Sequence, residues 1–366
     1  MQTKIVTDWQ GSSIGAECSL HQISPYIGKM KSTMAASLIH QFTAPGSRIY
    51  DPYVGSGTIA LEAWRLGRQV VASDLSPYAV TLSKAKLFPP ITVENALEEI
   101  ERCESYLRDP QSVDLRRVPI WVRKFFHPET LRETISWVEV LRRRRSHFLL
   151  SNLLGILHHQ RPGFLSFPSS HTVPYLRTRA FPPHRFPEMY EYRSVRNRLE
   201  RKVNRSLRKL PLLDFQLERK CYRRDSIRFL PKGKVDAIIT SPPYMRRLDY
   251  ARDNRLRLWF LGVSSWKALD ARLSPRESDF IRTMKYCLET WKCVLKNHGI
   301  CVLVVGDSYC TSSRMSLPEV VKALAVNAVG GYSLVSELSD PIPSERRVRR
   351  GHSGNLAETI LVLRAN

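Results

Sequence analysis

The chain has 366 residues, 43% of them hydrophobic, so it is long enough and apolar enough to fold around a substantial core. It carries 57 Lys and Arg residues against 34 Asp and Glu residues, which gives a formal net charge of +23. This excess predicts a polyanionic partner, with nucleic acid favoured over an acidic membrane surface. The longest near-apolar stretch, residues 148–157, is much shorter than the roughly 20 residues of a membrane span, so we expect no membrane association.

The cysteines and the first residues bear on metal binding and compartment. The seven cysteines form no Cys-x-x-Cys pair, so we predict no metal site. Scattered through a large chain, they are typical of reduced thiols in a cytoplasmic protein. The first residues, MQTKIVTDWQGSS, contain no apolar segment of the kind found in signal peptides.

The clearest local unit lies within residues 47–86. A short apolar strand ends at Asp51, a glycine-containing loop follows, and a helix is predicted over residues 58–66. A second strand ends at Asp74 and leads into a further helix. Such a β-α-β unit is typical of a parallel, doubly wound sheet.

Strand signals return only after residue 212. We predict one strand ending near Asp225, strands at 235–241 and 299–308, and a closing hairpin formed by 331–338 and 358–365. Sheet-forming sequence therefore occupies about 45–90 and 212–366. The fold class that follows is α/β, a doubly wound Rossmann-like sheet interrupted by a middle segment.

The middle segment, residues 91–211, differs in composition. It contains an arginine run (LRRRRSH, 141–147), a proline-rich stretch at 167–187 and the basic stretch RSVRNRLERKVNRSLRKL at 193–210. We interpret it as a basic, partly helical insertion beside the sheet. A solvated helix face is the ordinary explanation of a charge run, but so many cations with so few acids would repel one another without a polyanion.

The sequence DPYVGSGT at 51–58 places an acidic residue at a strand end, followed by two glycines. Gly55 and Gly57 permit a tight turn and a close approach of a ligand to the backbone. Asp74, at the end of the next strand, is placed to accept hydrogen bonds from ribose hydroxyls. A plain strand-to-helix turn is the alternative. A dinucleotide is not favoured, because Ala60 stands where Gly-x-Gly-x-x-Gly has its third glycine.

A second motif, TSPPY at 240–244, follows the apolar run VDAII. Proline fixes φ and lacks an N–H, and it also keeps the preceding residue out of the helical region. The segment from Ser241 to Pro243 is therefore rigid and extended. Taken alone, these prolines also fit a simple turn.

Together, DPYVGSGT, ASD at 72–74 and TSPPY resemble the S-adenosylmethionine-dependent DNA amino-methyltransferases. The segment SPYIGKMKSTMAASLI at 24–39 resembles the motif that precedes the glycine loop in that family. The resemblance covers most of 21–90 and 219–310 and implies a Rossmann-like methyltransferase sheet that binds S-adenosylmethionine. It implies cofactor contacts from Tyr26, Lys29, Asp51, Pro52, Tyr53, Gly55, Gly57, Thr58, Asp74 and Asp225.

The resemblance also implies a mechanism for TSPPY. An exocyclic base amine is a poor nucleophile because its lone pair is delocalised into the ring. The Ser241 side chain and the Pro242 carbonyl would accept its hydrogens, and Pro243 would keep both acceptors rigid. Tyr244 would stack on a base flipped out of the duplex. Serine in the first position favours N4 of cytosine, with N6 of adenine as the alternative, and the chain has no Pro-Cys pair of the kind that cytosine-C5 methyltransferases use.

The order of the motifs divides the chain into a cofactor-binding half (1–90), a target-recognition insertion (91–211) and a catalytic half (212–366). The expected partner is double-stranded DNA, with a cognate restriction endonuclease as a companion. An inactive DNA-binding subunit and an RNA base methyltransferase remain as other interpretations. The candidate DNA-contacting residues are Arg142, Arg143, Arg144, Arg145 and Arg196 of the insertion, and Arg346 and Arg347 of a second basic loop.

Overall fold

The computed structural model describes residues 5–9, 17–171, 173–243, 245, 249–273, 276–342 and 357–366. Its centre is a sheet in the order β3-β2-β1-β4-β5-β9-β8. The first five of these strands are mutually parallel, and β9 runs antiparallel to both β5 and β8. The strands are β1 Arg48–Asp51, β2 Gln69–Asp74, β3 Arg219–Arg223, β4 Val235–Thr240, β5 Leu295–Gly306, β8 Tyr332–Pro341 and β9 Ala357–Ala365.

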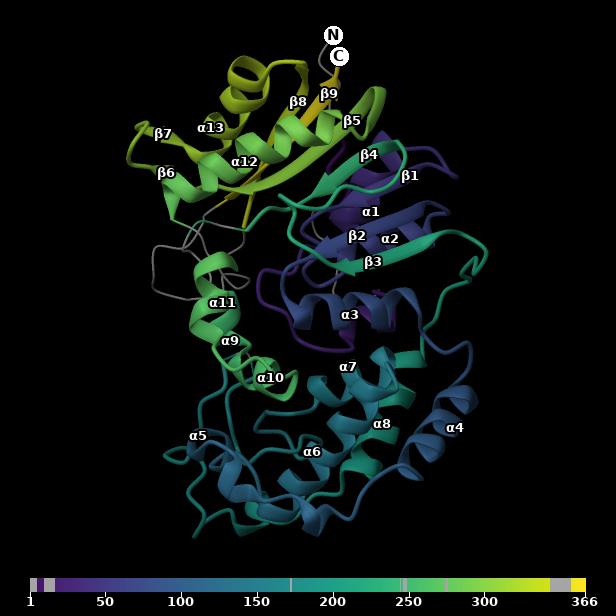
Figure 1. Cartoon of the computed structure of the whole chain (residues 1–366), viewed down its shortest axis with the longest axis vertical. Coiled ribbons are helices and arrows are strands. Elements are labelled where there is room, and N and C mark those ends of the chain that lie inside the picture. Colours follow the sequence, from purple (N-terminus) through teal and green to yellow (C-terminus); the bar gives the residue numbers. More distant parts are fainter. Residues whose placement is uncertain are drawn as a thin grey trace.

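Alternate strand residues face opposite sides of the sheet, and helices cover both faces (Figure 1). Ile49 belongs to the apolar core beneath α1, α2 and α3, whereas the next residue, Tyr50, belongs to a second core beneath α12 and α13. This alternation is the two-residue period of a strand buried on both faces. It confirms the predicted α/β, Rossmann-like fold class. The helices are α1 Ser32–Phe42, α2 Thr58–Arg65, α3 Pro77–Leu87, α12 Glu277–Lys292 and α13 Leu317–Ala323.

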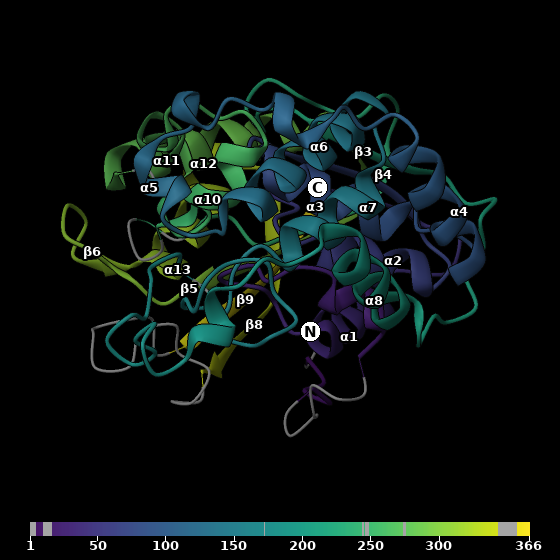
Figure 2. The ribbon, with the colours of Figure 1, turned by 90° about the horizontal axis from the view of Figure 1, so that it is seen from below.

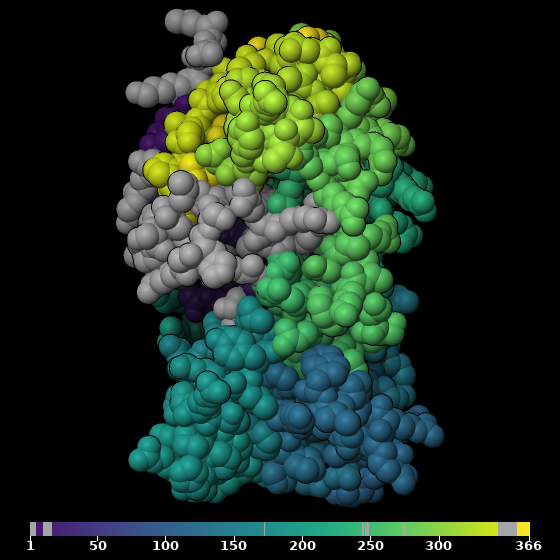
Figure 3. Space-filling view, turned by 90° about the vertical axis from the view of Figure 1, so that its left-hand side faces the viewer, coloured from purple at the N-terminus to yellow at the C-terminus, as the bar shows by residue number. Residues whose placement is uncertain are grey.

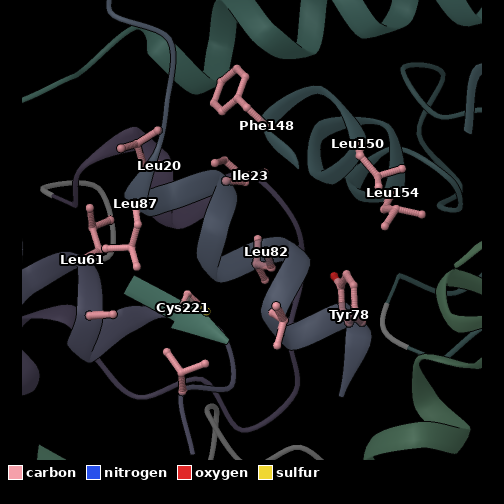
Figure 4. Packing of buried hydrophobic residues seen from close by; sticks show 14 of the residues in the cluster. Leu20, Ile23, Leu61, Tyr78, Leu82, Leu87, Phe148, Leu150, Leu154 and Cys221 are labelled. Atoms are coloured by element: carbon pink, nitrogen blue, oxygen red, sulfur yellow. The ribbon is translucent and has the colours of Figure 1, made fainter. Parts of the chain in front are cut away.

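A helical part is inserted between α3 and β3 and lies below the sheet in Figure 1, nearest the viewer in Figure 2. It packs on the sheet through α3 and α7, where Tyr78 and Leu82 of α3 lie on the side facing Phe148 and Leu154 of α7 (Figure 4). These residues belong to the same apolar cluster as the sheet core, so the two parts share one core. The helices of the inserted part are α4 Val93–Glu104, α5 Ile120–Arg123, α6 Pro128–Arg143, α7 His147–Gly155 and α8 Val195–Leu207.

The chain between β4 and α12 forms a column of short helices at one side of the sheet (Figure 1). These are α9 Tyr250–Asp253, α10 Arg255–Phe260 and α11 Trp266–Leu273, and the two-residue strands β6 Tyr309–Cys310 and β7 Met315–Ser316 follow β5. The remaining short elements are η2 Ser19–Gln22, η3 Pro110–Ser112, η4 Leu115–Arg117, η5 Pro187–Tyr190 and η6 Leu324–Val329. In the described part of the chain, no helix combines the length and the apolarity that crossing a bilayer requires.

Candidate active site

A cavity of about 380 Å³, here named the main cavity, lies at the carboxyl ends of the parallel strands. Ligands of open α/β sheets bind in this position, where the strand order reverses between β1 and β4. The volume falls within the roughly 300–1,000 Å³ of small-molecule and cofactor sites. The glycine loop after β1 forms one wall, and α11 and α12 form the opposite wall.

Asp51, the last residue of β1, lines the main cavity and is 1% exposed. Its Oδ1 accepts hydrogen bonds from the Thr240 hydroxyl at 2.7 Å and from the Tyr53 backbone N–H at 3.2 Å. Its Oδ2 is buried and has no hydrogen-bond partner in the described part of the chain. Burial raises the pKa of Asp51 to about 7. An unpaired carboxylate oxygen in a cavity wall favours a cationic or hydrogen-bond-donating ligand.

Asp74, the last residue of β2, also lines the main cavity. Its two carboxylate oxygens accept from the backbone N–H groups of Gly55 at 2.9 Å and Ser76 at 2.8 Å. Burial raises its pKa to about 6. The carboxylate therefore holds the glycine loop to the end of β2, a structural role beside the ribose contact expected from the sequence.

The two glycines of the loop have different neighbours. Both have positive φ, +48° at Gly55 and +73° at Gly57. Gly55 lines the main cavity, and a Cβ there would meet the Tyr26 ring at 3.5 Å. Gly57 is not among the lining residues, and a Cβ there would lie 3.0 Å from the Cα of Ser83 in α3. The ligand contact at Gly57 stays a prediction, and the structure shows that this glycine also lets α3 pack closely.

We expect Gly57→Ala to destabilise the protein more than Gly46→Ala. Both glycines are left-handed, so each alanine costs roughly 1–2 kcal/mol of backbone strain. A Cβ at Gly46 would have nothing within 4 Å, whereas a Cβ at Gly57 would also clash with the backbone of α3. Urea unfolding of the two variants measures the difference. Equal destabilisation would show that the packing against Ser83 is unimportant.

Two residues of the 24–39 segment, Tyr26 and Lys29, differ in their position relative to the main cavity. Tyr26 lines the main cavity and stacks on Tyr78 with ring centroids 5.8 Å apart. Lys29 is not a lining residue; its ammonium pairs with Glu17 at 3.2 Å and donates to the His21 carbonyl. The cofactor contact of Lys29 stays a prediction, and in the structure Glu17 compensates the charge of this lysine.

The other predicted cofactor residues come together at the main cavity. Pro52, Tyr53, Thr58 and Asp225 all line it. The Tyr53 hydroxyl lies 3.5 Å from the Cys287 thiol of α12, so the residue after Pro52 reaches across to the second core. Asp225, just beyond β3, pairs with Arg272 of α11 at 2.6 Å.

The TSPPY segment leaves β4 at the same cavity. Ser241 and Pro243 line it, whereas Pro242 is buried and is not among the lining residues. The Ser241 hydroxyl donates to the Val304 carbonyl of β5 at 3.0 Å, which fixes the hydroxyl oxygen in the cavity wall. The predicted stacking residue, Tyr244, lies outside the described residues.

The family described as DNA methylase matches residues 4–85 of this chain. Over this segment the chain is similar to the DNA amino-methyltransferases. The Type II methyltransferase M.BsoBI of Geobacillus stearothermophilus is 25% identical over 295 residues, which are 69% of this chain and 55% of that protein. The chain thus spans about half the length of this curated relative. The match of the DNA methylase family supports S-adenosylmethionine as the cofactor of this chain.

Solved structures give more distant similarities. TrmN from Thermus thermophilus has a TM-score of 0.39 at 14% identity, covering 95% of this chain and 52% of its own. The rRNA methyltransferase aviRa from Streptomyces viridochromogenes has a TM-score of 0.35 at 13% identity, covering 93% and 87%.

The predicted DNA-contacting arginines of the insertion differ in exposure and in ion pairing. Arg142, Arg143, Arg144 and Arg145 are exposed, and the Arg144 guanidinium lies 4.3 Å from the centre of the Tyr106 ring. Arg196 instead pairs with Glu200 at 2.9 Å and with Glu104 of α4. A phosphate contact of Arg196 stays a prediction, and carboxylates of α4 and α8 pair with this arginine in the structure. Arg346 and Arg347 lie outside the described residues.

Sequence reasoning missed the far wall of the main cavity. Tyr250 of α9, Arg272 of α11 and Phe280 of α12 line it, and they lie in the region of family resemblance but outside its short motifs. Thr240, which anchors Asp51, was also missed. Its position at a strand end beside Ser241 was the signal that could have found it.

Proposed function

We propose that the protein is an S-adenosylmethionine-dependent DNA methyltransferase that methylates the exocyclic N4 of cytosine in a flipped-out base. One observation carries the proposal: the glycine-loop strand and the Ser-Pro-Pro segment line a single cavity and are joined by the bond from Thr240 to Asp51. A cofactor and a base held by these two segments would meet in that cavity. This is the geometry that methyl transfer between them needs.

The residues present fit the cofactor. No described residue donates to the buried Oδ2 of Asp51, and this oxygen suits the ammonium group of the methionine part. Asp74 and Asp225 line the cavity and offer acceptors for ribose and adenine groups. The cofactor supplies an electrophilic methyl group on a sulfonium. The cavity wall supplies no covalent nucleophile in this proposal.

Ser241 acts on the base amine. Because its proton goes to the Val304 carbonyl, its oxygen presents acceptor lone pairs from a fixed position. Accepting an amine hydrogen there turns the nitrogen lone pair toward the methyl donor. The prolines keep the acceptor from reorganising during the reaction.

Adenine N6 is the competing target, because serine in the first motif position favours cytosine only statistically. RNA is the competing substrate. We also propose a cognate restriction endonuclease as a companion, since the curated relative is titled a Type II methyltransferase. The purified protein, given cofactor with a labelled methyl group, is expected to label genomic DNA. Label confined to total RNA would contradict the proposal.

The arginine run supplies a prediction about DNA affinity. Changing Arg142, Arg143, Arg144 and Arg145 to Gln should flatten the salt dependence of DNA binding, by roughly 0.9 in the log–log slope for each phosphate that the variant no longer neutralises. Fluorescence anisotropy with a short duplex measures the slope. The variant Lys296→Gln, Lys322→Gln on the sheet side controls for net charge. If both variants give the same slope change per charge, the run is only a solvated surface.

A further inference from the structure

A second, smaller cavity of about 180 Å³ lies in the helical part, away from the main cavity. We name it the α8 pocket. It contains the side chains of three cationic residues and no Asp or Glu. Its lining residues are Gln22, Gly155, Ile156, Arg161, Gly163, Phe164, Lys202, Arg205 and Ser206.

Within the described residues, the cations of the α8 pocket have no carboxylate partner. Arg161 and Arg205 make no side-chain hydrogen bond or ion pair with any described residue, and Lys202 donates to the Gln22 carbonyl at 2.7 Å. Arg198, Lys202 and Arg205 stand at positions i, i+4 and i+7 of α8, so they share one face. Arg196, in contrast, is paired with the carboxylates of α4 and of Glu200.

The electrostatics of the α8 pocket favour an anion. Burial and the nearby Arg205 lower the pKa of Lys202 to about 7, because both disfavour its charge. An anion in the pocket would stabilise that charge and relieve the repulsion among the three cations. His171, close to Arg161 and Lys202, has its pKa lowered to about 4 by burial and by neighbouring cations and His159, so it is neutral at pH 7.

Residues 22–26 connect the α8 pocket to the main cavity. Gln22 lines the α8 pocket and Tyr26 lines the main cavity, so their Cα atoms are at most about 14 Å apart. Gly155, at the end of α7, packs directly on this segment, since a Cβ there would lie 2.1 Å from the Ile23 carbonyl oxygen. Both α7 and α8 belong to the helical face seen in Figure 2.

We propose that the α8 pocket binds a backbone phosphate of the DNA whose target base enters the main cavity. The proposal rests on the proposed function for the identity of the polyanion. A guanidinium group can donate two parallel hydrogen bonds to two phosphate oxygens, so Arg161 and Arg205 suit a phosphate. Held in a pocket that is linked to the main cavity through residues 22–26, the phosphate would set the position of the strand relative to the cavity.

The test compares two double variants with equal charge loss. Arg161→Gln, Arg205→Gln removes pocket cations, whereas Arg201→Gln, Arg208→Gln removes exposed cations of the same helix region that do not line the pocket. We expect the pocket variant to lower duplex DNA affinity at least tenfold and to reduce the salt slope by roughly 0.9 or more, with a smaller effect in the control. Equal effects of both variants would overturn the proposal. Loss of affinity for RNA but not for DNA would overturn it as well.

A second measurement tests whether the pocket binds an anion in the absence of DNA. Isothermal titration calorimetry measures the heat of binding when inorganic phosphate is added to the wild-type protein at pH 8. The comparison of two buffers with different ionisation enthalpies gives the number of protons taken up. We expect proton uptake, because the anion raises the pKa of Lys202, and we expect the uptake to vanish in Lys202→Gln. Binding of phosphate without any effect of the pocket variant on DNA affinity would overturn the assignment to DNA. A salt-slope difference in a protein that methylates no DNA would contradict the proposed function and leave the pocket assignment standing.

Discussion

Replacing Asp51 with Asn is expected to lower the affinity for S-adenosylmethionine by roughly 10- to 100-fold. A hydrogen bond to a charged group contributes about 1.5–3 kcal/mol, and tenfold in affinity corresponds to about 1.4 kcal/mol. Asn keeps an oxygen for Thr240 and the Tyr53 N–H but places an amide nitrogen where the unpaired Oδ2 stands. Isothermal titration calorimetry measures the loss. Unchanged affinity would remove Asp51 from the cofactor site.

The same variant should not lose stability. The pKa of Asp51 is about 7 in the folded protein against an ordinary 3.8, so the folded state binds more protons between these values. The unfolding free energy contributed by this group therefore falls as pH rises from about 4 to 7. We expect Asp51→Asn to melt higher than the wild type at pH 8 and closer to it at pH 5. Asp74→Asn is the matched control: both Asp74 oxygens accept backbone N–H groups, so it should destabilise by about 1–3 kcal/mol.

Replacing Ser241 with Ala is expected to lower kcat by roughly 10²–10³-fold, the range seen when a preorganised transition-state hydrogen bond is removed. DNA and cofactor affinity should change little, because the hydroxyl acts mainly in the transition state. Ser241→Asn restores an acceptor and should recover part of the rate. Pro243→Ala should lower kcat more than DNA affinity, since it loosens the segment. Single-turnover kinetics separate the two effects. A normal rate in Ser241→Ala would exclude the serine from the reaction.

The elements that the sequence predicted well are those specified by neighbouring residues. The end of β1 at Asp51, the glycine loop, the end of β2 at Asp74 and the β8–β9 hairpin follow from local apolar runs and turn residues. The start of β5 does not. It begins at Leu295 rather than at 299, because pairing with Val235 of β4 extends it across an irregularity. That pairing is between residues far apart in the chain.

Three predicted site residues have partners in the structure that the sequence motifs do not contain. Gly57 packs against Ser83, Lys29 pairs with Glu17, and Arg196 pairs with Glu104. No sequence motif predicts any of these contacts. The consecutive arginines at 142–145 stand out in the sequence, yet α8 gathers cations at helical spacing around a pocket. Figure 3 shows the helical part, blue to teal, in the lower half of this face beneath the sheet part.

Mass spectrometry of nucleosides from the genomic DNA of host cells tests the central claim most directly. Cells of a strain without amino-methylated bases would express either the wild type or Asp51→Asn. We expect N4-methylcytosine in DNA from cells with the wild type and a strong reduction with Asp51→Asn. N6-methyladenine in place of N4-methylcytosine would contradict the assignment to cytosine, and C5-methylcytosine alone, or unmodified DNA beside a folded and expressed wild type, would contradict the mechanism itself.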